Sequence, residues 1–284
     1  MPLLIWGPWV LDVIESLDNF LCFSLSSRIS PFRKHSALFF SVGQPRTVCA
    51  FLTLTQEKIH HCSFRVSTID IKPIKVARNL GAWFDSHFSM STHISMSCSA
   101  AFFWLHNIKR ISQFLSRDKL EMVLHAFVTS RIDYCNGLLY GLPDCEIAKL
   151  TRVQNAAARL LMSCKKYDHI TPVLINVHWL PVRYRINFKI LLLTFKALYG
   201  MAPTYIIDLI HTKTNTRYLL RSNEGVLLKH PSGKMKKSFG DRSFSVAAPT
   251  LWNALPVSLL SIKFISTSKS NLKTYLCKLA LNIS

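Results

Sequence analysis

The carboxylates of this chain are too widely spaced to indicate chemistry at a pair of metal ions. The 284 residues include 15 Asp and Glu, and no two Asp residues are adjacent. Two-metal catalysis needs carboxylates that hold two cations about 3.5–4 Å apart. Asp85 follows the dipeptide Leu80-Gly81, but the serines of Ser89–Ser91 come soon after it and favour a role in a turn or at a helix start. We therefore predict no catalytic residue and no metal ligand.

Thiols and imidazoles are numerous, but their spacing matches no known reactive or metal-binding pattern. The eight Cys include no C-x-x-C pair, and none has a His at zinc-finger spacing. The chain also lacks the G-x-S-x-G sequence of a nucleophile elbow and the G-x-x-x-x-G-K-[ST] sequence of a phosphate-binding loop. These observations predict free thiols in a reducing compartment, no cofactor and no small-molecule substrate.

Positive charge is the stronger indication of a partner. Lys and Arg total 35, which gives a formal net charge of +20. An excess of this size favours nucleic acid or an anionic membrane surface, although an ordinary solvated surface is the alternative. No stretch supplies the roughly 20 predominantly apolar residues of a membrane span, and the apolar N-terminus lacks the basic start of a signal peptide. We expect an intracellular chain, in the nucleus or the cytoplasm, that is not secreted and binds no membrane.

The basic residues expected to contact phosphate lie near predicted helix ends, on one helix face and in one glycine-flanked loop. Two of them are seven residues apart and so share a helix face, and two more open a helix, where backbone N–H groups also favour a phosphate. The predicted nucleic-acid-binding residues are Lys109, Arg110, Arg152, Arg159, Arg183, Arg185, Lys234, Lys236 and Lys237.

Hydrophobic periodicity predicts a mainly α fold, in which a short β-hairpin precedes a helical bundle and a basic, loop-rich segment follows it. Alternating apolar residues over Phe64–Phe84 predict the hairpin. The predicted helices begin near Ser91, near Ser116, near Asp144 and after Pro181, and the last of these is apolar nearly all round and should be central. Shorter helices are expected around 248–255 and 270–281.

The helical stripes name the residues expected to be buried. In the first helix the stripe is Ile94, Cys98, Phe102, Leu105 and Ile108, and in the second it includes Leu120, Leu124 and Phe127. The expected organisation is a poorly ordered or diverged segment over residues 1–63, a hairpin over 64–90, a bundle over 91–210 and the basic segment over 211–284.

Several long sequence words, in order and spacing, resemble the region after the catalytic palm in reverse transcriptases of jockey-like non-LTR retrotransposons. They include "NLGAWFDSHFSMSTHI" at Asn79–Ile94, "HAFVTSRIDYCNGLLYGLPD" at His125–Asp144 and "GDRSFSVAAPTLWNALP" at Gly240–Pro256. The resemblance covers the chain from about Arg65 to the C-terminus. It implies a primer-grip hairpin at Leu80 and Gly81, followed by the helical thumb that closes over an RNA–DNA hybrid.

The same resemblance implies RNA-templated DNA synthesis with Mg²⁺ for the parent protein, at an aromatic-Ala-Asp-Asp turn upstream of the Leu-Gly word. This chain has no Asp-Asp pair. We therefore expect a fragment that is not an enzyme and that at most grips duplex nucleic acid without sequence preference. Two alternatives stay open: a relic of a truncated mobile element with no activity, and an enzyme whose carboxylates come from Asp12, Glu15, Asp18 and Glu57.

Overall fold

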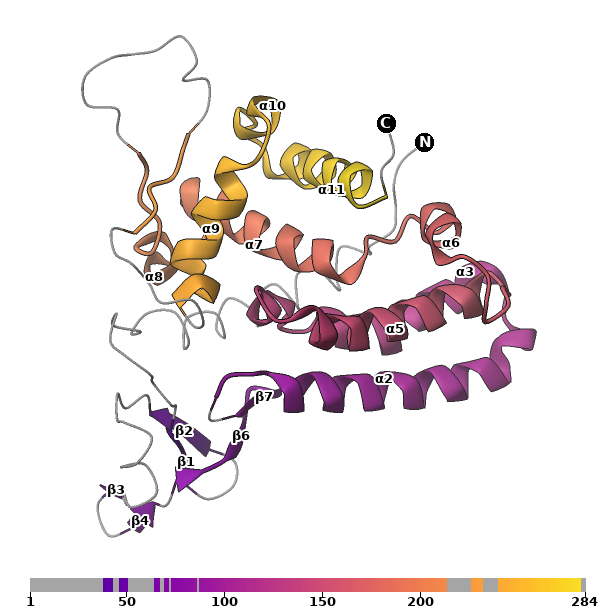
Figure 1. Cartoon of the computed structure of the whole chain (residues 1–284), viewed down its shortest axis with the longest axis horizontal. Coiled ribbons are helices and arrows are strands. Elements are labelled where there is room, and N and C mark those ends of the chain that lie inside the picture. The colour runs from indigo at the N-terminus through magenta and orange to yellow at the C-terminus, as the bar shows by residue number, and fades with distance from the viewer. Residues whose placement is uncertain are drawn as a thin grey trace. The chain divides into compact units, whose positions relative to one another are not determined.

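The computed structural model of the chain describes residues 38–42, 46–50, 64–66, 69–71, 73–85, 87–213, 226–231 and 240–281. Contacts between residues divide it into two compact units, with the boundary between Ser99 and Ala100. The fold is mainly helical, and a short antiparallel hairpin precedes the helices, as the sequence predicts (Figure 1). Of the segment predicted over residues 1–63, only 38–42 and 46–50 lie within the described residues.

The unit before Ala100 is built from antiparallel strands. β1 (Leu38–Val42) pairs with β2 (Arg46–Ala50) and with β5 (Pro73–Ile74), which gives the strand order β2-β1-β5. A second pair joins β3 (Phe64–Val66) and β4 (Ile69–Ile71). The hairpin formed by β1 and β2 was not predicted, because the segment before Ser63 shows no sustained strand period.

The third pair, β6 (Val76–Asn79) and β7 (Ala82–Asp85), is a tight hairpin. Asn79 pairs with Ala82, so only Leu80 and Gly81 form the loop. Both have positive φ, 46° and 88°, as a two-residue type I′ turn requires. Gly81 therefore serves the turn itself.

Five helical segments form the first part of the bundle. They are α2 (Ser91–Ile111), which crosses the boundary between the units, α3 (Arg117–Leu124), the π-helical segment η3 (His125–Thr129), α4 (Ser130–Asp133) and α5 (Asp144–Leu161). The short 3-10 segments η2 (Ser112–Phe114) and η4 (Asn136–Leu139) connect them. In α5 the apolar residues Ile147, Leu150, Val153, Ala157 and Leu161 recur at helical spacing, and all five are buried.

Two positions of the predicted stripes are wrong. Phe102 in α2 is exposed, and the neighbouring Ala101 is fully buried in its place. Phe127 is exposed because the π-helical turn contains more residues than an α-helical turn, which rotates Val128 into the core instead.

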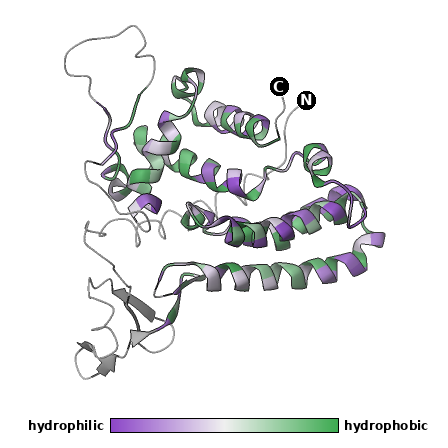
Figure 2. Cartoon of the chain, in the orientation of Figure 1, coloured by the Kyte–Doolittle hydropathy of each residue, from purple (hydrophilic) through white to green (hydrophobic). Residues whose placement is uncertain are grey.

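The central helix is α7 (Val182–Leu198), which begins directly after Pro181 and ends before Gly200. All residues from Ile190 to Phe195 are buried, as expected for a central helix, and the hydrophilic residues of α7 lie mainly in its first half (Figure 2). The helices α9 (Phe244–Asn253) and α11 (Ile265–Leu281) pack against it (Figure 1). Leu191 and Phe195 of α7 meet Trp252 of α9 and Leu272 of α11 in one core.

Short helices complete the helical unit that begins at Ala100. They are α6 (Ile170–Asn176), α8 (Thr204–Ile207), the 3-10 segment η5 (Gly240–Arg242) and α10 (Val257–Leu260). None of the helices in the described part of the chain is long and apolar enough to cross a membrane.

Candidate nucleic-acid interface

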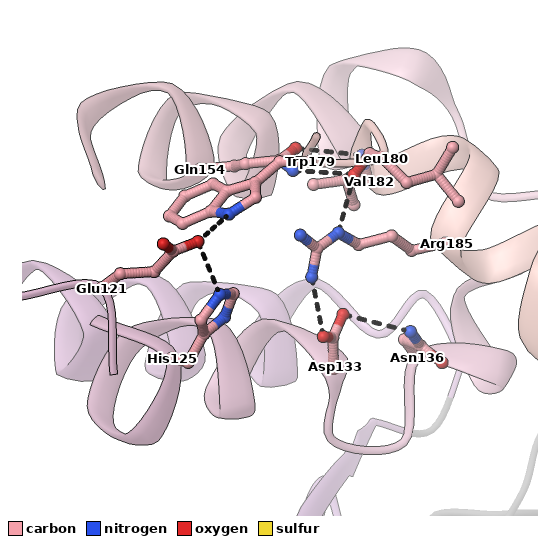
Figure 3. Close-up of polar contacts among 9 residues, drawn as sticks. All are labelled: Glu121, His125, Asp133, Asn136, Gln154, Trp179, Leu180, Val182 and Arg185. Atoms are coloured by element: carbon pink, nitrogen blue, oxygen red, sulfur yellow. Dashed lines mark hydrogen bonds and ion pairs between the residues drawn. The ribbon is translucent and has the colours of Figure 1, made fainter. Parts of the chain in front are cut away.

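Two hydrogen bonds of the Gln154 side chain, which we call the Gln154 bracket, hold the start of α7 against the middle of α5. The side chain of Gln154 donates from Nε2 to the carbonyl oxygen of Leu180 at 2.8 Å, and its Oε1 accepts from the backbone N–H of Val182 at 3.1 Å. Gln154 is buried, so one side chain satisfies two backbone groups at the helix start (Figure 3). The bracket fixes where the residues on either side of it, Arg152 and Arg183, are placed.

Arg152 and Arg183 line one groove of about 370 Å³ between α5 and the start of α7. Arg152 is exposed, and the Arg183 side chain is 54% exposed. The N-terminal N–H groups of α7 carry the partial positive charge of the helix dipole at the same place. The groove therefore joins two of the predicted phosphate-binding residues to a helix start that favours an anion.

One carboxylate shares this groove. Asp144, the first residue of α5, forms an ion pair with Arg183 at the surface. Exposed ion pairs of this kind contribute only about 0–1 kcal/mol. A phosphate group therefore has to displace a weakly held partner to reach the Arg183 guanidinium.

The prediction that Arg185 belongs to the nucleic-acid interface is wrong. It is 6% exposed, its Nη1 lies 2.8 Å from Asp133 Oδ2, and its Nε donates to the carbonyl oxygen of Leu180 at 2.7 Å (Figure 3). The physical reason is helical periodicity: position 185 shares the inward face of α7 with Val182 and Ile186. Its guanidinium is not available to a nucleic acid.

The remaining predicted cations are dispersed. Lys109 and Arg110 are exposed in the last turn of α2. Arg159 is half-buried and donates from Nη2 to the carbonyl oxygen of Asp168 at 3.2 Å, so it fastens the turn that follows α5. Lys234, Lys236 and Lys237 lie outside the described residues.

The predicted primer-grip-like pair, Leu80 and Gly81, forms the tip of the hairpin between β6 and β7. Leu80 is exposed there. The hairpin belongs to the other compact unit, and its tip offers an apolar side chain and backbone groups rather than charge.

Asp85 stabilises a turn, which is the role that the sequence favours. Its Oδ1 accepts from the backbone N–H groups of His87 at 3.1 Å and Ser89 at 2.9 Å, and its Oδ2 accepts from the Ser89 hydroxyl at 2.9 Å. This carboxylate closes the turn that leads into α2. Within the described residues no group of three or more His, Cys, Asp or Glu is arranged to hold a metal ion.

The interior of the helical unit, which begins at Ala100, contains a polar cluster beside the hydrogen bonds of Gln154. The Trp179 indole N–H donates to Glu121 Oε1 at 3.4 Å, and His125 Nε2 lies 3.5 Å from the same oxygen (Figure 3). Burial lowers the pKa of His125, and the nearby Arg185 lowers it further, while Glu121 raises it. The cluster joins α3, η3 and the segment before α7, so it positions helices rather than presenting a reactive group.

Gln154 and Asp133 were not predicted as important residues. The available signal was Arg185 itself, a cation among the apolar residues of α7, because a buried guanidinium needs a carboxylate partner.

Comparison with known proteins identifies no relative: no family model matches the chain, and no curated protein or solved structure matches it either.

Proposed function

We propose that this chain grips double-stranded nucleic acid, including an RNA–DNA hybrid, through its phosphates and without sequence preference. The observation that supports the proposal best is the groove in which Arg152 and Arg183 meet at the start of α7. Phosphate contacts of this type position a duplex but carry no information on base sequence. The net charge of +20 supports association with a polyanion over the whole molecule.

We further propose that the chain derives from the region after the palm of a jockey-like non-LTR reverse transcriptase. The sequence words from Asn79 to Pro256 support this origin, and the order of hairpin and helical bundle agrees with it. On this proposal the bundle is the thumb, Leu80 and Gly81 belong to a primer grip, and the chain acts in the nucleus or the cytoplasm. Because the Asp-Asp pair is missing, we propose that it is not an enzyme and uses no Mg²⁺.

The salt dependence of binding tests the gripping function. The affinity of the full chain for a labelled DNA duplex and for an RNA–DNA hybrid would be measured by fluorescence anisotropy over a range of salt concentrations. On B-form DNA the slope of log affinity against log salt is about −0.9 for each phosphate that the protein neutralises. Replacing Arg152→Gln and Arg183→Gln together should weaken binding to all sequences alike and make this slope shallower by about 0.9 for each phosphate that the variant no longer neutralises.

A matched control separates the groove from general charge. Lys263→Gln with Lys278→Gln removes the same charge at exposed positions near and within α11. The control should retain most of the slope. Equal reductions in affinity and slope in the two double variants would refute the groove as the site, and undetectable or salt-insensitive binding by the wild-type chain would leave the inactive relic as the explanation.

Primer extension tests the enzymatic part of the proposal. The purified chain should add no nucleotide to a primer on an RNA template with Mg²⁺ or Mn²⁺. Template-dependent incorporation that disappears on replacing Asp12 or Asp18 would reveal a catalytic site in the N-terminal segment and contradict the proposal.

A further inference from the structure

The outward face of α2 is aromatic where a helix surface is normally polar. Phe102 is 44% exposed and Phe103 is 62% exposed, whereas Ala101, Leu105 and Ile108 form the buried face of the same helix. Solvent-facing helix residues are usually charged or polar. Two adjacent exposed phenylalanines therefore indicate a surface that contacts something other than water.

Aromatic contacts extend this surface from α2 to the π-helical segment. The rings of Phe103 and Trp104 meet edge to face with their centroids 5.7 Å apart, and the centroid of the Trp104 ring lies 4.5 Å from that of Phe127. Phe127 is itself exposed, in the η3 segment that turns it outward. Single π-helical turns occur frequently at functional sites. The Trp104 ring thus joins and supports two exposed phenylalanine side chains.

Positive charge lies next to these rings on the same helix. Lys109 and Arg110 are exposed, and Arg110 follows Phe103 by seven residues, which is two helical turns or about 10 Å on the same face. Figure 2 shows the hydrophobic middle of α2 giving way to hydrophilic residues at its C-terminal end. The sequence of α2 contains no Asp or Glu, so no carboxylate of the helix opposes an anion.

We infer that Phe102, Phe103, Phe127, Lys109 and Arg110 form an aromatic–basic face that binds single-stranded nucleic acid. Unpaired bases stack on the phenylalanine rings, and the following phosphates contact Lys109 and Arg110. The inference rests on the proposed nucleic-acid function and adds a second class of ligand, an unpaired strand, at a surface other than the groove. A second copy of this chain is a poorer occupant, because two chains of net charge +20 repel each other.

Two labelled probes test this inference on the full chain: oligo(dT), which offers unpaired bases, and a blunt DNA duplex of equal length, which does not. Replacing Phe102→Ala and Phe103→Ala together should weaken oligo(dT) binding about tenfold and leave duplex binding unchanged. Both side chains are exposed, so the core should be unaffected. Phe264→Ala removes an aromatic ring that is 76% exposed elsewhere on the surface and should change neither affinity.

Two further variants separate stacking from general hydrophobic contact. Phe103→Trp keeps a π-face and should retain the affinity for oligo(dT). Phe103→Leu keeps an apolar side chain without a ring and should weaken oligo(dT) binding as much as the single Phe103→Ala substitution, whereas a protein interface would tolerate leucine.

The outcomes distinguish this inference from the proposed function. Oligo(dT) binding that is insensitive to the phenylalanine variants, alongside normal duplex binding, overturns the inference alone. Self-association that is abolished in the Phe102→Ala and Phe103→Ala chain, again with unchanged oligo(dT) affinity, also overturns it and identifies a protein interface. Failure to bind either probe overturns the inference together with the proposed function.

Discussion

Arg185 Nη1 lies 2.8 Å from Asp133 Oδ2, and both residues are buried. The pair joins α7 to the end of α4, across 52 residues of sequence. The same guanidinium also bonds the carbonyl oxygen of Leu180, which the Gln154 side chain holds as well. The Gln154 side chain and the buried ion pair therefore meet at one backbone carbonyl, directly before the Pro181–Arg183 segment that lines the groove, so removal of the pair should disturb the start of α7.

Arg185→Met should destabilise the protein by about 3 kcal/mol. The substitution leaves the Asp133 carboxylate buried without its cation, and breaking a buried pair in this way typically costs about 3–5 kcal/mol. The free energy of unfolding from urea titration is the measurement. Arg183→Met is the matched control, since that arginine lies in the same helix but pairs with Asp144 at the surface, where the expected cost is below about 1 kcal/mol. Equal effects would contradict the structural role of Arg185.

The stability of the protein should fall as the pH drops below the ordinary pKa of histidine. The pKa of His125 lies below 6.5 in the folded chain because of burial and Arg185, with Lys273 adding to the effect and Glu121 opposing it. The unfolded chain therefore binds the proton more readily than the folded chain. This contribution is fully present above about pH 6.5 and is lost as the pH falls toward the lowered pKa.

Urea titrations at several pH values measure this dependence. His125→Gln should flatten the change in unfolding free energy between about pH 7 and pH 5. His106→Gln, at an exposed position in α2, is the control and should retain the wild-type dependence. A His125→Gln chain with an unaltered pH dependence would show that other groups govern stability in this range.

Sequence patterns predicted the helices well because caps, prolines and apolar periods are local features. The helix α7 begins after Pro181 as expected, and the apolar stripe of α5 is buried throughout. The patterns did not predict the orientation of single residues. The sequence Ala-Ala-Phe-Phe at 100–103 is apolar at every position, so period alone cannot tell that Ala101 is buried and Phe102 is exposed.

The candidate site was predictable in part for a similar reason. Arg183 and Arg185 both open α7, but their two-residue separation places them on different faces, and only Arg183 reaches the surface. The buried partner Asp133 and the bracket residue Gln154 are distant in sequence from α7. Their roles depend on tertiary packing, which no local pattern encodes.

Leu80→Asn should stabilise the hairpin by about 1 kcal/mol. Leu80 has φ of 46°, a left-handed conformation that is strained for leucine and readily adopted by asparagine. Thermal or urea unfolding of the full chain gives the measurement. Leu80→Ala is the control: it removes the exposed side chain but keeps a Cβ in the same conformation, so the strain should remain. Equal gains in both variants would trace the effect to the exposed leucine side chain instead.

Asn253→Ala should release the short strand-like segment around Leu228 from α9. The Asn253 side chain accepts from the backbone N–H of Leu228 and donates to the carbonyl oxygen of Leu228, each at 2.9 Å, while the backbone groups of Leu227 and Lys229 bond the segment around Thr212. Each buried group left without a partner costs about 1–3 kcal/mol, which should speed amide hydrogen exchange at Leu228 about tenfold or more.

Exchange at the core residue Leu192 serves as the internal reference and should change little, because the effect is local. Asn176→Ala, at an exposed position in the last turn of α6, is the control substitution and should leave the Leu228 amide protected. The Trp252 indole still donates to the Val226 carbonyl oxygen, a bond of 2.8 Å that the Asn253→Ala substitution does not remove. If Leu228 exchange is unchanged, this bond and the backbone bonds that join Leu227 and Lys229 to Lys213 and His211 are sufficient to hold the segment, and the asparagine side chain does not govern its docking.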